Sequence, residues 1–259
     1  MTNVSAAGRA AEARLAPLLA EAYRVFASPT PPLPLLVCSC DVCFTSDAQA
    51  AFVQFALPEI PTGYLLAYLT SVPLEVPGDD DATRRGVVQR AHFLPRVLTG
   101  LVRGEELSYL VEMTLEKFDF ACPGAYSPAQ LAFLRRFATS WAAELCTHPH
   151  PSSRGYPALP VLLEMWQRAG LDVTAAVCEV WAGHAAAVPA IRNYLAVLET
   201  TNPTTPAPEP QWRFLEQWVY RPAVRAAFTA GLEAALLAGS EEEDETQQWE
   251  AWYTYLSSL

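Results

Sequence analysis

The sequence has little glycine, little charge and almost no lysine. Glycine supplies 12 of 259 residues, and none of them forms the Gly-rich loop that cradles a phosphate group. Charged residues make up 17%, and Lys117 is the only lysine among 17 basic residues. A basic set made almost entirely of arginine is typical of a GC-rich coding sequence before it indicates any chemistry.

The short signatures of common catalytic classes are also missing. No G-x-S-x-G, G-x-x-x-x-G-K-[ST] or H-E-x-x-H pattern occurs. Arg84-Arg85 and Arg135-Arg136 are isolated pairs and form no basic stripe, so we expect no nucleic-acid binding. The sequence therefore favours a protein that is not an enzyme. A helical enzyme that uses His92 in a cleft is the remaining catalytic alternative.

Long apolar runs are absent as well. No segment approaches the 18 apolar residues that span a bilayer, and the longest uncharged stretches contain proline. Charged side chains interrupt the N-terminal region where a signal peptide would be apolar; they are Arg9, Glu12, Arg14, Glu21 and Arg24. We therefore expect a cytoplasmic protein with no membrane partner, whose six cysteines are reduced thiols or metal ligands.

The excess negative charge is concentrated in two segments. Of the eleven net negative charges, eight come from Asp79, Asp80, Asp81, Glu241, Glu242, Glu243, Asp244 and Glu245. Such segments are often solvated connectors that aid solubility. They can also attract a basic protein and speed its encounter. Trp249 and Trp252 follow the second segment, and tryptophan is enriched at protein interfaces.

Helical periodicity punctuated by proline fills most of the chain. We expect helices over residues 6–26, 46–56, from 61, 82–102 with a kink or a restart near Pro95, 107–118, 128–146, 157–169, 172–183, 188–200, 210–220, 222–237 and 246–256. Leu35-Leu36-Val37 is the one short strand candidate. The pattern predicts an all-α fold, an irregular bundle of about ten to twelve helices in which some pairs could stack as in a helical solenoid.

Length and linker composition favour a single domain over residues 1–259. Residues 202–210 contain four prolines and no apolar pattern, which is typical of a linker. The roughly fifty residues that follow are marginal as a separate core. We therefore expect residues 211–259 to form a C-terminal subregion that packs on the main domain.

The segment Cys38-Ser39-Cys40-Asp41-Val42-Cys43 combines C-x-C with C-x-x-C. Two thiolates separated by two residues can hold one tetrahedral metal ion from a tight turn, and such a turn suits zinc. The fourth ligand must come from elsewhere; the candidates are Cys146, His148 and His150. The alternative is three ordinary cysteines in a half-buried arm. A redox role is less favoured because no βαβ pattern surrounds the segment.

Four segments carry a resemblance to other proteins. The cysteine cluster follows a proline-rich arm, and His92–Arg96, Leu115–Phe118 and Leu131–Leu145 around Trp141 come after it. This order resembles a family of uncharacterised bacterial α-helical proteins over most of the chain. The resemblance implies a soluble helical protein with a tight thiol cluster. It implies no activity and no catalytic residues.

Two functions remain open from the sequence. The first is a protein–protein interaction module without catalysis, which would neutralise a basic partner as immunity proteins and antitoxins do. The acidic segments and the aromatic C-terminal region favour it. The second is a zinc-binding structural or sensor protein that uses Cys38, Cys40 and Cys43.

Overall fold

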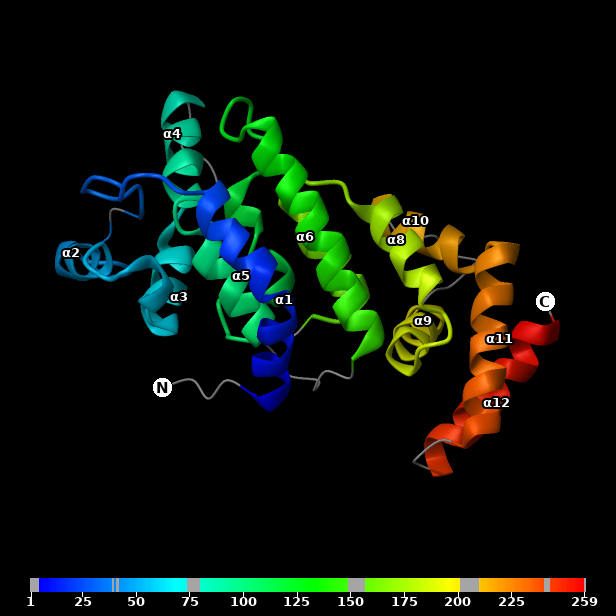
Figure 1. The fold of residues 1–259 in the computed structure, drawn as a ribbon. Coiled ribbons are helices and arrows are strands. Elements are labelled where there is room, and N and C mark those ends of the chain that lie inside the picture. Colours follow the sequence, from blue (N-terminus) through cyan, green and yellow to red (C-terminus); the bar gives the residue numbers. More distant parts are fainter. Residues whose placement is uncertain are drawn as a thin grey trace. The chain divides into compact units, whose positions relative to one another are not determined.

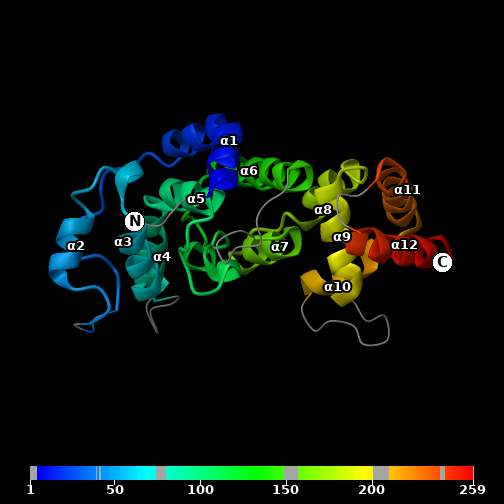
Figure 2. The same ribbon diagram turned by 90° about the horizontal axis from the view of Figure 1, so that it is seen from below.

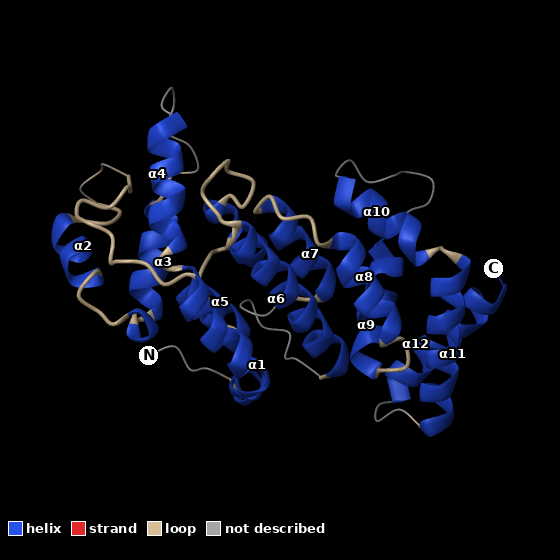
Figure 3. Cartoon of the chain, turned by 45° about the horizontal axis from the view of Figure 1, so that its top comes forward, coloured by secondary structure: helices blue, strands red, loops and turns tan. Residues whose placement is uncertain are grey.

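The computed structural model describes residues 5–38, 40, 42–73, 80–148, 157–200, 210–239 and 243–258. Within these ranges all regular structure is helical (Figure 3). The predicted all-α fold is therefore confirmed. Leu35–Val37, the strand candidate, forms no strand and belongs instead to an extended arm.

The α-helices are α1 (Ala6–Val25), α2 (Ser46–Phe52), α3 (Thr62–Ser71), α4 (Asp80–Ala91), α5 (Leu94–Arg103), α6 (Pro128–Thr147), α7 (Leu159–Arg168), α8 (Thr174–Gly183), α9 (Val188–Thr200), α10 (Pro210–Val219), α11 (Pro222–Ala238) and α12 (Glu243–Ser258). Three short 3-10 helices are η1 (Leu57–Glu59), η2 (Val111–Met113) and η3 (Glu116–Phe118). The order along the chain can be followed in Figure 1.

The chain divides into two compact units. The first comprises Met1–Trp141, His150–Pro157 and Glu164–Val173, and the second comprises Ala142–Pro149, Ala158–Leu163 and Thr174–Leu259. Residues 201–209, which include most of the predicted linker, lie outside the described residues. The region from 211 onward belongs to the second unit together with α8 and α9.

Helix α5 lies in the core of the first unit. Nine of its ten residues, Leu94–Val102, are buried. Helix α1 lies beside it (Figures 1 and 2). A Cβ at Gly8 would collide with the carbonyl oxygen of Arg103, so glycine allows the two helices to approach closely. The Arg103 guanidinium also donates two hydrogen bonds of 2.7 Å to the Glu12 carboxylate, which fixes the contact.

The predicted helix over 82–102 is two helices. Helix α4 ends at Ala91 and α5 begins at Leu94, which places Pro95 in the first turn of α5. Proline has no N–H to donate and its ring clashes with the preceding turn, so the helix is interrupted before it. Of the two outcomes predicted near Pro95, a kink or a restart, the structure has the restart, with a complete break at His92 and Phe93.

The predicted helix over 107–118 is wrong. The segment forms the short helices η2 and η3, and Asp119 follows with a φ of 40°. Leu115 and Phe118 are both fully buried. Side chains three residues apart share one face of a 3-10 turn, so these two turns bury the same apolar pair that an α-helix would have buried.

The second unit has an aromatic core. The rings of Tyr194 and Phe228 stack with centroids 4.1 Å apart, and those of Trp181 and Trp218 lie 5.0 Å apart. Two of the polar atoms are satisfied by backbone oxygens. Trp181 Nε1 donates to Ala190 O at 3.0 Å, and Tyr194 Oη donates to Val219 O at 2.7 Å. These contacts confirm the core role of Trp181, and Trp141 and Trp166 are likewise fully buried.

None of the described helices combines the length and the apolarity that crossing a membrane requires.

Candidate metal centre

The cysteine cluster lies on a turn whose two ends are anchored. Leu35 and Phe44 are buried on either side of it. The buried Gln49 side chain joins these flanks, because its Oε1 accepts from Leu35 N at 2.9 Å and its Nε2 donates to Phe44 O at 3.1 Å. Cys38 N also donates to Ser71 O at 2.7 Å, which attaches the turn to the end of α3. Hydrogen bonds and buried side chains on both flanks therefore fix the position of the turn.

The start of α2 fixes the C-terminal flank of the turn. Thr45 is the N-cap of α2, and its Oγ1 accepts from Ala48 N at 3.2 Å. The sequence predicted Ser46 as this cap and a helix that reached residue 56, whereas α2 ends at Phe52. The Phe44 ring packs against Phe52 and Tyr68, with centroids 5.5 and 6.0 Å apart. Cys43, the last cysteine of the cluster, therefore directly precedes a residue whose ring is packed against two other aromatic rings.

The three sulfur atoms of the cluster converge. Among the described residues, Cys38, Cys40 and Cys43 form a group whose Sγ atoms all lie within 4.8 Å of one another, and all three side chains are exposed. The backbone of the turn supports this arrangement. Cys40 N donates to Cys38 Sγ and Cys43 N donates to Cys40 Sγ, both at 3.4 Å. These N–H···S contacts are the kind that stabilise a thiolate.

The sulfur spacing is close to what one zinc ion needs. With Zn–S bonds of about 2.3 Å, a tetrahedral site places its sulfur atoms about 3.8 Å apart. The observed limit of 4.8 Å is about 1 Å wider, which χ1 rotations of exposed cysteine side chains can close. The donor set and its geometry therefore fit a thiophilic metal ion with one coordination position left open.

One thiol of the cluster is acidic. The pKa of Cys40 is lowered from 9.0 to about 6, chiefly because the Cys43 thiol donates a hydrogen bond to its sulfur and also because the Val42 backbone does so. The pKa of Cys43 is raised to about 11 because its proton is held in that same hydrogen bond. The turn therefore carries a thiolate at neutral pH, the form of cysteine that binds metals.

Two hollows flank the cluster. One, of about 370 Å³, is lined by Cys38, Cys40, Thr45, Asp47 and other residues at the start of α2. Among the described residues that line it, Asp47 is the one that carries a carboxylate, although it lies outside the group of three sulfur atoms. Sequence reasoning missed it. Its signal was an acid four residues after Cys43 in the first turn of a predicted helix.

The second hollow, of about 380 Å³, is apolar and lies on the Cys43 side. Val42 and Tyr64 are among the residues that line it. Val42 is 88% exposed, so the tip of the turn presents apolar surface next to the thiols.

Cys146 and His148, two of the fourth ligands predicted from the sequence, lie in the second unit, whereas the cluster lies in the first. Cys146 is fully buried, and burial raises the pKa of its thiol to about 12. His148 is at the end of α6, where its Nδ1 lies 3.2 Å from Glu144 Oε2 and 2.9 Å from Thr147 Oγ1. His150 lies outside the described residues. A ligand role for these three stays a prediction.

The acidic segments are only partly described. Asp79, Glu241 and Glu242 lie outside the described residues. Asp80 and Asp81 are exposed and begin α4. Glu243, Asp244 and Glu245 begin α12.

The two tryptophans that were candidates for a partner surface differ in exposure. The Trp249 side chain is 3% exposed, so its indole packs inside the second unit and offers no surface to a partner. Trp252 is half-buried and meets Tyr255 edge to face, with centroids 5.7 Å apart. Trp252 is thus the one of the pair that a partner could touch.

The remaining histidines and cysteines have local roles. His92 lies in the break between α4 and α5, where its Nδ1 is 3.1 Å from Ser28 Oγ. His184 follows the end of α8, and its Nδ1 lies 2.8 Å from Val180 O. Cys178 is buried, whereas Cys122 is half-buried.

No family model, no curated protein and no solved structure matches this chain.

Proposed function

We propose that this protein binds one zinc ion through the thiolates of Cys38, Cys40 and Cys43. The observation that carries the proposal is the convergence of three Sγ atoms within 4.8 Å on one anchored turn. This is the second of the two functions that the sequence left open.

The exposure of these thiols supports metal binding over three ordinary cysteines. Free cysteine is among the residue types most often buried, and exposed free thiols are prone to oxidation. Cys146 and Cys178 follow that rule and are buried, while all three cluster cysteines are exposed. Three exceptions within six residues, with their sulfur atoms turned toward one another, are explained by a shared ligand.

The anchoring of the turn favours a sensing or transfer role over a structural one. Gln49, Leu35, Phe44 and Ser71 hold the flanks through hydrogen bonds and burial that need no metal. A structural zinc site, in contrast, contributes most of the folding energy of its surroundings. A surface site on a preformed turn can gain and lose zinc while the unit stays folded.

The fourth coordination position faces the hollow on the Cys38 and Cys40 side. Asp47 lines that hollow and carries a carboxylate, which is an accepted zinc ligand. We propose that Asp47 or a water molecule completes the site. Cys146, His148 and His150 remain the alternatives predicted from the sequence.

Metal content of the untagged protein tests the proposal. Purified protein is loaded with zinc, desalted and measured by inductively coupled plasma mass spectrometry together with a thiol titration. We expect one zinc per chain with three thiols protected. The variant with Cys38, Cys40 and Cys43 changed to serine should hold no zinc, and Cys122→Ser should hold the wild-type amount. Equal zinc in the triple variant and the wild type would refute the site.

Substitutions then identify the fourth ligand. Asp47→Asn keeps the size of the side chain and removes its charge, so it should weaken zinc binding several-fold if Asp47 coordinates the ion. Cys146→Ala and His148→Ala provide the competing test. A loss in either of these and not in Asp47→Asn would assign the fourth position to the end of α6. Charge-transfer absorption of the cobalt-loaded protein reports the thiolate count in each variant.

The interaction role predicted from the charge distribution is a second proposal. Asp80 and Asp81 are exposed at the start of α4, in the first unit. Acidic groups of this kind would suit a basic partner. A partner retained by the wild type should be released by moderate salt, and it should be lost when Asp80 and Asp81 are changed to asparagine. A partner held equally by that variant would not use this surface.

A further inference from the structure

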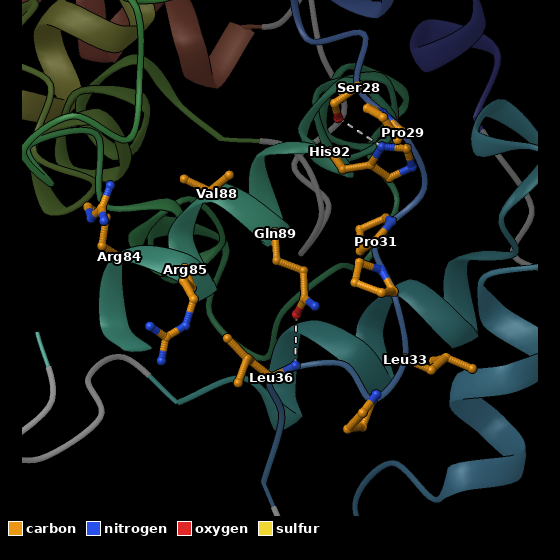
Figure 4. Close-up of a pocket in the computed structure, with 12 residues that line it drawn as sticks. Ser28, Pro29, Pro31, Leu33, Leu36, Arg84, Arg85, Val88, Gln89 and His92 are labelled. Carbon is orange, nitrogen blue, oxygen red and sulfur yellow. Dashed lines mark hydrogen bonds between the residues drawn. The ribbon is translucent and has the colours of Figure 1, made fainter. Parts of the chain in front are cut away.

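A third cavity lies in the first unit, beside α4. It has a volume of about 600 Å³ and runs between the extended arm at residues 28–36 and one side of α4 (Figure 4). Four prolines of the arm line it, together with Leu33, Leu36 and Val88. Its volume lies within the range of about 300–1,000 Å³ that is usual for small-molecule sites.

The walls of this cavity are held in place. Leu36 N donates to Gln89 Oε1 at 2.7 Å, and Ser28 Oγ lies 3.1 Å from His92 Nδ1 (Figure 4). These two contacts fasten both ends of the arm to the region of α4. Because proline fixes its own φ and has no N–H, the arm between them is stiff and offers few donors of its own.

Apolar surface is left open to water in the cavity. Leu33 is 47% exposed and Val88 is 50% exposed, although each is an aliphatic side chain. The proline rings add flat apolar faces beside them. Covering such surface contributes about 25 cal/mol for each Å² removed from water. The cavity therefore favours an occupant with a flat apolar body.

The polar groups of the cavity carry positive charge and hydrogen-bond donors. Among the described residues that line it, Arg84 and Arg85 carry charge and none is acidic, in a chain whose net charge is −11. Arg84 makes an exposed ion pair of 3.4 Å with Asp81, a contact of the weak class. At the other end, the Gln89 and His92 side chains point toward the arm (Figure 4). Gln89 Oε1 is taken by Leu36 N, which leaves the amide nitrogen as a donor.

We propose that this cavity binds a small aromatic carboxylate. The aromatic ring lies against the proline rings, Val88 and Leu36, and the carboxylate meets the arginine end of α4. Guanidinium groups pair with carboxylates through two parallel hydrogen bonds, which gives the site its preference for an anion. This site is independent of the zinc proposal, because none of the residues that line it belongs to the cysteine cluster.

The test uses naphthalene-2-carboxylate as the probe and naphthalene-2-methanol as its uncharged counterpart. Binding to the full-length protein is measured by isothermal titration calorimetry and by saturation-transfer NMR. We expect saturable binding of the acid, and at least tenfold weaker binding of the alcohol.

Two matched double variants distinguish the effect of positive charge at the cavity from the effect of the net charge of the protein. Changing Arg84 and Arg85 to glutamine should weaken binding of the acid at least tenfold and leave the affinity for the alcohol unchanged. Changing the other arginine pair, Arg135 and Arg136, to glutamine removes the same charge elsewhere and should leave both affinities at the wild-type level. Val88→Trp should fill the cavity and weaken both probes. Circular dichroism and zinc content report that each variant is folded and that its metal site is unaffected.

Three results would overturn the proposal. The first is no saturable binding of the acid to the wild type. The second is equal affinity for acid and alcohol, and the third is an equal loss in the two arginine variants. Saturable binding of an acidic aromatic peptide with none of naphthalene-2-carboxylate would instead assign the cavity to a protein partner.

Discussion

Helix α5 and the cysteine turn differ in how they place polar side chains: those at α5 are buried and paired, and those at the turn are exposed. The Arg96–Glu105 ion pair at α5 is buried, with Nη2 and Oε2 2.7 Å apart. Ile60 O accepts from Arg96 Nε at 2.9 Å, and Thr62 Oγ1 donates to Glu105 Oε2 at 2.8 Å, so that Arg96 Nη1 is the only nitrogen of the guanidinium without a partner. At the turn, three thiols face solvent and contact one another. The first unit thus pairs the charge that it buries at α5 and exposes the thiols that it carries on the turn.

The largest effect should come from removing one member of the buried pair. Glu105→Ala leaves the Arg96 guanidinium buried without its counter-charge, so the free energy of unfolding should fall by about 3–5 kcal/mol. Urea denaturation of wild type and variant measures the difference. Glu21→Gln is the control, because Glu21 pairs with Arg136 at the surface. It should cost no more than about 1 kcal/mol. Similar losses in both variants would remove the contrast between the buried and the exposed groups.

The cysteine turn, in contrast, should contribute to stability only when zinc is bound. With chelator present, changing all three cluster cysteines to serine should alter the free energy of unfolding by no more than about 0.5 kcal/mol, since exposed side chains contribute little packing. With free zinc at one hundred times its dissociation constant, the wild type should gain about 2.7 kcal/mol and the triple variant nothing. Thermal denaturation with chelator and with zinc provides both numbers. A large loss in the metal-free variant would show that the thiols support the fold directly.

The close approach of α1 and α5 gives a third comparison. Gly8→Ala places a methyl group against the Arg103 carbonyl oxygen, which belongs to backbone and cannot swing aside. Overpacking of this kind should cost about 1–3 kcal/mol. Gly63→Ala in α3 is the matched control, because nothing lies within 4 Å of its added Cβ. It should be neutral or stabilising by up to about 1 kcal/mol. An unchanged free energy of unfolding in Gly8→Ala would mean that α1 and α5 can move apart without loss of stability.

Local signals in the sequence predicted most helices well. Ser127 and Pro128 marked the start of α6, Gly170 marked the turn after α7, and Pro222 marked the first residue of α11. Caps, proline and glycine act within one turn, so a sequence reader can find them. The convergence of the three thiols was also local, since six residues of chain leave them little room to separate.

The errors arose where distant residues decide the structure. The 107–118 segment looked helical because its apolar spacing suits several kinds of turn, and the 3-10 turns of the structure bury Leu115 and Phe118 as an α-helix would have done. The Arg96–Glu105 pair depends on Ile60 and Thr62, which lie more than thirty residues before Arg96. Asp47 was missed as a candidate ligand because only the fold shows which carboxylate lines the same hollow as Cys38 and Cys40.

The low pKa of Cys40 gives a fourth test of the exposed turn. In metal-free protein its thiolate should form with a midpoint at about pH 6, well below the ordinary value of 9.0, because hydrogen bonds from Cys43 and from backbone N–H groups favour the charged form. Alkylation by iodoacetamide at a series of pH values, followed by mass spectrometry of the peptides, measures this midpoint. Cys43 should react only at much higher pH. Cys40→Ser should abolish the low-pH reaction. Equal alkylation of Cys40 and Cys43 at pH 6 would contradict the hydrogen-bonding pattern.

The smallest effect should come from His92, which lies between the two extremes because it is half-buried at the break between α4 and α5. Burial lowers its pKa below the ordinary value of 6.5, so the unfolded chain binds the proton more readily than the folded protein does. Stability should therefore fall as the pH drops through 6.5 and level off once the folded form is also protonated. His92→Gln removes this titration and should make the unfolding midpoint in urea less sensitive to a change from pH 7 to pH 5. A steeper dependence in the variant would mean that a charged His92 stabilises the break, and hence that a charge-assisted hydrogen bond from His92 to Ser28 holds the arm.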